Sequence, residues 1–207
     1  MAILNVNPTR MELSRLKKRL KTATRGHKLL KDKRDEMVRQ FMALIRENKS
    51  LREQVEKEVF EAQRSFLGAR MTMTPPDLEA ALLHPARRVA LDVGKMNIMS
   101  VEVPKIDIKE VDSEESFYPY GMLNTVGELD IAVDNLSAVL PDLIKLAELE
   151  KTCNMLADEI EKTRRRVNAL EYVMIPQLEE TIKYITMKLD ENERGNTTRL
   201  MKMKELM

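Results

Sequence analysis

The residues of this chain that could perform catalytic chemistry are few and lie far apart in the sequence. The histidines are His27 and His84, and neither has a cysteine or second histidine at the spacing of a metal site. The only cysteine, Cys153, falls on the apolar stripe of a predicted helix, where a thiol packs as a small apolar group. The glycine-rich patterns that cradle phosphates are missing. We therefore expect a protein that is not an enzyme and holds no cofactor or metal.

Basic side chains gather in one part of the sequence, although the net charge is only +1. Residues 10–70 contain 18 Lys and Arg against 9 Asp and Glu, and most of this excess lies before residue 35. A basic helix can bind phosphates, but no aromatic residue lies between Arg10 and Asp35 to stack on single-stranded bases. We interpret this face as a protein-contacting surface, with a nucleic-acid-binding arm as the weaker alternative.

A second charged group is the run Arg164, Arg165 and Arg166. Three consecutive helical residues point in three directions, so at least one should meet a partner helix or another protein. In an antiparallel helix pair, Arg164 should lie level with about position 45. Glu47 is then the expected acceptor.

The elements that position these residues are predicted to be long helices. The chain is 33% charged and 4% aromatic, with 6 Gly, a composition that disfavours sandwiches, barrels and doubly wound sheets. Thr9 and Glu12 have the spacing of a capping box. A helix from there to about Met71 carries a heptad seam typical of a coiled coil. Its predicted positions are Leu16, Leu20, Ala23, His27, Leu30, Arg34, Met37, Phe41, Leu44, Asn48, Leu51 and Val55.

The last part of the chain repeats this pattern. Alternating steps of four and three give a second seam, with kinks expected at Pro141 and Pro176. Its predicted positions are Leu146, Glu150, Cys153, Ala157, Ile160, Arg164, Val167, Glu171, Met174, Leu178, Thr181 and Ile185.

The segment between the two helices predicts a small head. Thr74 opens a short helix that Pro85 should end, and residues 112–115 form an acidic loop. A β-hairpin is predicted around a turn at Gly94 and Lys95. Its apolar residues are Val89, Leu91, Val93, Met99, Val101 and Val103, with Ile106 and Ile108 extending it.

The predicted fold is mainly α, a long antiparallel two-helix coiled coil with a small central head. We expect an N-terminal helix over 1–73, the head over 74–128 and a C-terminal helix over 129–207, with both termini at the end far from the head. The longest stretch without charge, residues 116–127, is too short to span a bilayer, so no membrane insertion is expected. The lone cysteine and the absence of a signal-peptide pattern favour an intracellular protein.

Three segments together resemble the D subunit of the V-type (archaeal and bacterial A/V-type) rotary ATPases. They are Asn7-Pro8-Thr9-Arg10-Met11-Glu12-Leu13, Arg25-Gly26-His27-Lys28-Leu29-Leu30-Lys31-Asp32-Lys33-Arg34-Asp35-Glu36 and Glu161-Lys162-Thr163-Arg164-Arg165-Arg166-Val167-Asn168-Ala169-Leu170-Glu171. The resemblance covers both helices, whereas the head agrees only in outline.

The resemblance implies a non-catalytic central-stalk rotor that couples ATP hydrolysis or synthesis to H⁺ or Na⁺ transport. Its partners would be hexamer subunits A and B, the F subunit of the stalk and the C/d-type adaptor on the membrane ring. The protein would be cytoplasmic and peripheral to the membrane. Arg10, Arg15, Lys18 and Arg25 are then predicted to contact the hexamer, and the hairpin to bind a stalk partner. The alternative from another class is a prefoldin-like holdase, which is also an antiparallel coiled coil with a hairpin.

Overall fold

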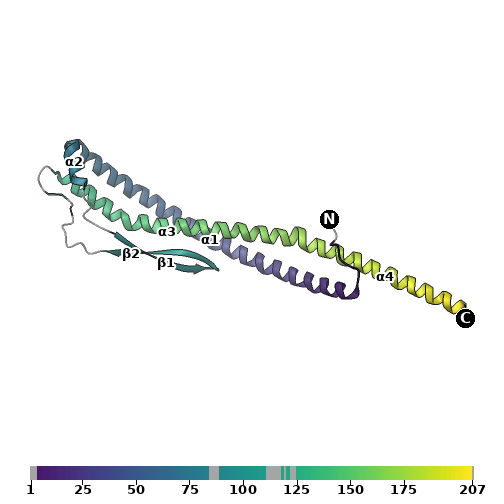
Figure 1. The fold of residues 1–207 in the computed structure, drawn as a ribbon. Coiled ribbons are helices and arrows are strands. Elements are labelled where there is room, and N and C mark those ends of the chain that lie inside the picture. The colour runs from purple at the N-terminus through teal and green to yellow at the C-terminus, as the bar shows by residue number, and fades with distance from the viewer. Residues whose placement is uncertain (1–3, 84–88, 111–117, 119, 122–124, 207) are drawn as a thin grey trace. The chain divides into compact units, whose positions relative to one another are not determined.

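The computed structural model of the protein describes residues 4–83, 89–110, 118, 120–121 and 125–206. Its elements are α1 (Arg10–Thr72), α2 (Pro75–Leu82), β1 (Val89–Ile98), β2 (Val101–Glu110), α3 (Gly127–Ala169), the π-helical turn η1 (Leu170–Met174) and α4 (Ile175–Glu205) (Figure 1). The mainly helical fold with a short helix and one hairpin is confirmed. The acidic loop, His84 and the helix end at Pro85 lie outside the described residues. The division into 1–73, 74–128 and 129–207 stays a prediction.

The seam predicted for α1 is confirmed along its whole length. The Thr9 hydroxyl accepts a hydrogen bond from the Glu12 N–H at 3.2 Å, which satisfies one free donor of the first turn. Every predicted seam position is buried or half-buried, and Leu16, Met37 and Val55 are almost fully so. Polar seam residues are half-buried too, and the His27 Nε2 lies 3.3 Å from the Glu171 carboxylate.

The described chain divides into two compact units, of which the first contains Met1–Val38 and Glu159–Met207. Leu16 and Ala23 of α1 pack there against Leu178 and Ile185 of α4. The two helices run antiparallel, because contacts move down α4 as they move up α1. Arg10 pairs with Glu193, whereas His27 faces Glu171.

The seam predicted for the last helix was placed wrongly over part of its length. Arg164 is exposed, and Thr163 is buried in its place at 2% exposure. Glu171 and Met174 are exposed as well, and the partly buried Leu170 and Ile175 contact the core instead. Leu170 is the first residue of η1 and Ile175 follows its last residue. The wider π-helical turn brings these two residues, five positions apart, onto one face. A fixed alternation of four and three cannot describe this step.

The two prolines of this region have different positions. Pro141 lies inside α3, and the helix continues through it. Pro176 lies in the first turn of α4 directly after η1, where a missing N–H is tolerated.

The second unit contains Arg39–Asp158. Ala69 and Met73 pack with Ala81 of α2 and Leu129 of α3. The Thr72 hydroxyl donates to the Glu128 carboxylate at 3.0 Å, and Arg52 lies 3.5 Å from Glu150. Within this unit, α1 and α3 are therefore also antiparallel.

The hairpin is confirmed, but its turn was predicted in the wrong place. Met99 and Ser100 form the turn, both with positive φ, and Gly94 lies inside β1 opposite Lys105. Met99 is therefore a turn residue and not part of a strand. The observed register pairs apolar residues across the strands, including Leu91 with Ile108 and Val93 with Ile106. A turn at residue 94 would separate these pairs.

Candidate interaction surfaces

The four basic residues predicted to contact another protein lie at the start of α1, in the first unit. All are exposed. Arg10 pairs with Glu193 of α4, and Arg15 pairs with Glu12 at 3.2 Å within its own helix. Exposed ion pairs contribute little to folding free energy, so these side chains remain available for another surface.

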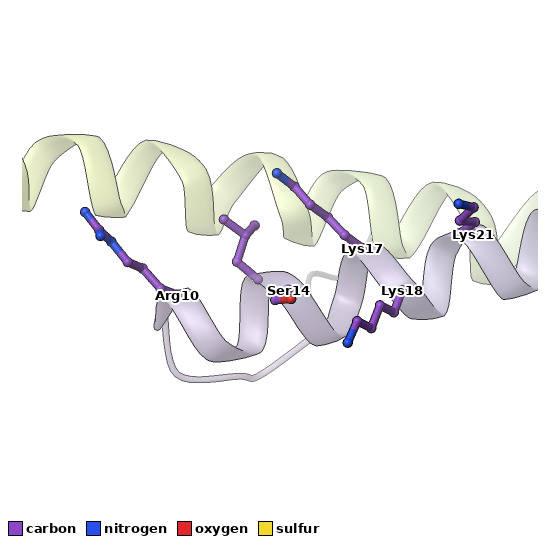
Figure 2. Close-up of a pocket in the computed structure, with 6 residues that line it drawn as sticks. Arg10, Ser14, Lys17, Lys18 and Lys21 are labelled. Carbon is purple, nitrogen blue, oxygen red and sulfur yellow. The ribbon is translucent and has the colours of Figure 1, made fainter.

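A shallow hollow of about 390 Å³ lies on this basic face. Figure 2 shows Arg10, Lys17 and Lys21 extending toward the neighbouring helix, whereas Lys18 points away from it. The hollow is lined by one end of α1, by Arg10, Leu13, Ser14, Lys17, Lys18 and Lys21. Four cations around one hollow raise the local positive potential, which favours an acidic partner surface.

The C-terminal end of α4 extends past the start of α1 within this unit, as Figure 1 also shows. Arg10, the first residue of α1, lies level with Glu193, yet α4 continues to Glu205. Every residue from 190 to 206 is exposed, including Leu200 at 70%, Met201 at 62% and Met203 at 64%. Apolar side chains that protrude together from a single helix mark a protein contact. The sequence pattern did not reveal this overhang, because it depends on the register between the two helices.

The arginine run lies on the outside of the first unit. Arg164, Arg165 and Arg166 are all exposed, and Arg165 pairs with Glu161 one turn away. Thr163 and Val167, which flank the run, are buried, so the interhelical seam passes through these two residues and not through Arg164. Glu47 belongs to the second unit. Its pairing with Arg164 stays a prediction.

The hairpin is attached to the second unit through β2. Val101 and Val103 are buried, and the Ile106 N–H donates to Glu148 of α3. On β1, by contrast, Leu91 is 49% exposed and Val93 is 63% exposed. Because only β2 pairs with β1, the other edge of β1 presents free backbone donors and acceptors in the described sheet.

Two tyrosines, Tyr118 and Tyr120, lie in the segment between the hairpin and α3. The Tyr120 hydroxyl donates to Asp130 at 2.7 Å and the Tyr118 hydroxyl donates to Asp134 at 3.1 Å. Burial, followed by the hydrogen bond to Asp130, raises the pKa of Tyr120. Both hydroxyls stay neutral near neutral pH, and their hydrogen bonds hold the end of the head against α3. No spacing in the sequence indicates such pairs.

Groups suited to chemistry are scarce in the described residues. Cys153 is buried as expected, and burial raises the pKa of its thiol. Within the described ranges, no three His, Cys, Asp or Glu side chains come close enough together to hold a metal ion. A search of the same residues finds no helix with the length and apolar character needed to cross a bilayer.

The fold defines a class of protein, a mainly helical chain with long helices in its first and last parts and a short helix and a two-stranded antiparallel hairpin between them. Residues 12–205 match the family described as the D subunit of ATP synthase, and the chain belongs to that family.

Relatives named as the D subunit of V-type ATP synthase match the chain over its full length. The one from Acetivibrio thermocellus is 62% identical over 208 residues, which cover 100% of this chain and 94% of the relative. The one from Thermoanaerobacter sp. strain X514 is 59% identical over 206 residues, covering 100% and 98%. The one from Clostridium novyi is 58% identical over 209 residues, covering 100% and 97%. The predicted family is therefore confirmed, and the rotary-ATPase interpretation is favoured over the holdase.

Proposed function

We propose that this chain is the non-catalytic central-stalk rotor of a V-type ATP synthase or ATPase. It would couple ATP hydrolysis or synthesis in the catalytic hexamer to H⁺ or Na⁺ transport by the membrane ring. The observation that carries the proposal is the family match over residues 12–205, together with relatives near 60% identity that bear the name of this stalk component. The protein would be cytoplasmic and held at the membrane by its partners.

The first unit is the proposed contact for hexamer subunits A and B. Two features support this assignment. Arg10, Arg15, Lys18 and Arg25 form an exposed basic face, and the end of α4 carries exposed Leu and Met side chains beyond the last contact with α1. A central opening in the hexamer that is lined by apolar side chains, with acidic groups at its entrance, would cover both the basic face of α1 and the apolar end of α4. The exposed arginines 164–166 would add to the same contact.

The hairpin is the proposed contact for the F subunit of the stalk or the C/d-type adaptor. Its β1 strand is exposed along its length, with apolar Val89, Leu91 and Val93 at the surface. β2 is attached to α3, so β1 is the strand available to a partner.

A rotor also requires asymmetry, because its orientation must favour one of several chemically equivalent catalytic sites at a time. The basic side chains supply this property. They are concentrated on α1, where residues 10–34 hold 11 Lys and Arg against 2 Asp and Glu, whereas residues 171–193 of η1 and α4 hold 2 Lys against 6 Asp and Glu. Each rotor orientation would then stabilise one catalytic conformation more than the others.

The test is binding of the full chain to a reconstituted hexamer of A and B subunits. Replacing Arg10, Arg15, Lys18 and Arg25 together with Gln should weaken binding at least tenfold at low salt and lower ATP-driven ion pumping, with a smaller difference from wild type at high salt, where the wild-type attraction is already screened. The matched control replaces Lys49, Lys57, Arg64 and Arg70, which are equally exposed basic residues of the second unit, with Gln. If the two groups of substitutions weaken hexamer binding equally, then hexamer binding depends on the net charge of the chain and the basic face is not the contact. If the wild-type chain binds no hexamer but retains RNA or DNA, the rotor proposal is wrong.

A further inference from the structure

Three departures from a regular coiled coil occur at one level of the first unit. Between α3 and α4, the π-helical turn η1 occupies Leu170–Met174, and the Ile175 N–H donates a hydrogen bond to the Leu170 carbonyl five residues earlier. Pro176 follows directly and has no N–H to donate. This turn is therefore held by hydrogen bonds of poorer regularity than the α-helix on either side.

The second departure is Gly26 in α1, opposite this turn. The neighbouring His27 places its Nε2 3.3 Å from Glu171 Oε2, which sets the two segments level. A Cβ on Gly26 would meet no atom within 4 Å, and Gly26 does not adopt positive φ. Neither close packing nor backbone geometry requires a glycine here. Its direct effect is to weaken the helix by about 1 kcal/mol relative to alanine.

The third departure is a thin core. On α1, no side chain between Ala23 and Met37 is fully buried, and all residues between them are described. On the helical segment that faces α1, no side chain between Val167 and Leu178 is fully buried either. The half-buried Leu170 and Ile175 are the apolar side chains that η1 and its end contribute to the core. Few buried contacts lower the free energy needed to open a segment locally.

We propose that residues 24–30 and 170–176 form a compliant joint in the coiled coil. Within the first unit, the two helices bend and twist more readily at this level than beside the buried residues Leu16 and Leu178. The His27–Glu171 contact joins the two weak segments, so that they deform together and not separately. If the chain is a rotor, as proposed above, the joint twists when one end of the coiled coil is held and the other end is turned. This role rests on the proposed function, whereas the joint itself does not.

Hydrogen exchange of the full isolated chain, followed by mass spectrometry, tests the joint without reference to the rotary complex. Amides in 24–30 and 170–176 should exchange at least tenfold faster than those in the flanking segments 13–20 and 178–185, which contain the core residues Leu16, Leu178 and Ile185. Equal or slower exchange at the joint would overturn the proposal.

The variant Gly26→Ala separates a joint from a locally weak helix. The added methyl has open space, so the fold is retained. Amide exchange should slow about fivefold in 24–30 and also in 170–176 on the facing helical segment. The matched control is Gly195→Ala, where the added methyl also meets nothing within 4 Å and the residue lies in the exposed end of α4. It should leave exchange in both joint segments unchanged. Slowing confined to 24–30 would show two independent weak helices, and the joint would be rejected.

Discussion

The backbone N–H of Ile106 in β2 donates a hydrogen bond to the Glu148 carboxylate of α3, with the nitrogen and oxygen 3.0 Å apart. In this register, Ile106 faces Val93 across the hairpin, and its N–H is directed away from β1. A helix side chain thus takes the place of the next strand on one edge of the hairpin, and the opposite edge is left open.

Replacing Glu148 with Gln should loosen the hairpin without unfolding the helices. A hydrogen bond to a charged acceptor contributes about 1.5–3 kcal/mol, and the amide oxygen of Gln retains only part of it. Amides of residues 101–108 should exchange about tenfold faster, with unchanged exchange in α1. The control is Glu102→Gln, which removes only an exposed pair with Lys95 and should have a much smaller effect. Equal effects of the two variants would mean that Glu148 does not hold the hairpin.

Replacing residues 89–110 by a short Gly-Ser linker should separate the two proposed contacts. The helical circular-dichroism signal should remain nearly intact, because the second unit keeps the core formed by Ala69, Met73 and Leu129. Binding of the F subunit or the adaptor should fall, while hexamer binding is retained. Lost hexamer binding with normal stalk-partner binding would show that the two assignments are reversed.

The core of the first unit should be sensitive to a cavity at Leu178, which is 1% exposed and contacts Leu16 and Ala23. Leu178→Ala should lower the free energy of unfolding by about 2–5 kcal/mol in urea titrations followed by circular dichroism. Leu200→Ala removes the same atoms from a site that is 70% exposed, and should change the free energy of unfolding by less than about 0.5 kcal/mol. Similar losses at both sites would contradict the described packing.

The seam position can be tested at adjacent residues. Arg164→Gln should change the free energy of unfolding by less than about 0.5 kcal/mol, because Arg164 is exposed. Thr163→Gln forces a larger polar side chain into a site that is 2% exposed and should cost about 1–3 kcal/mol. Urea titration of both variants gives the comparison. The opposite order of costs would restore Arg164 to the seam.

The first helix was predictable in detail because heptad spacing is a direct consequence of 3.6 residues per turn. From Leu16 to Val55, nothing in α1 interrupts that period, so one starting position determines all the others. The second seam was predictable only in part, because η1 inserts a step of five after Leu170 and no residue from 170 to 174 indicates it. Pro176 was the available signal, and it was interpreted as a kink.

The hairpin shows a similar limit. Alternation of apolar residues correctly predicted two strands, but Gly94 was a misleading turn signal because its φ is negative. Met99 and Ser100 are unusual residues for a turn with positive φ at both positions. The informative residue was Asn97, whose side-chain oxygen accepts from the Ser100 N–H at 2.9 Å. The exposed surfaces, in turn, depend on contacts between distant parts of the chain.

The end of α4 beyond Glu193 has a consequence for how the chain meets its partner. A single helix of about a dozen residues is marginally stable in water, so we expect this helical segment to fray in the isolated chain. If the proposed partner covers this segment, its order is gained on association, and the lost conformational entropy reduces the net affinity. Arg194, Arg199, Lys202 and Lys204 are cleavage sites for trypsin in this segment, and a covering partner would shield them. Under the proposed assignment, the rate at which trypsin trims this end would measure how much of the protein is assembled.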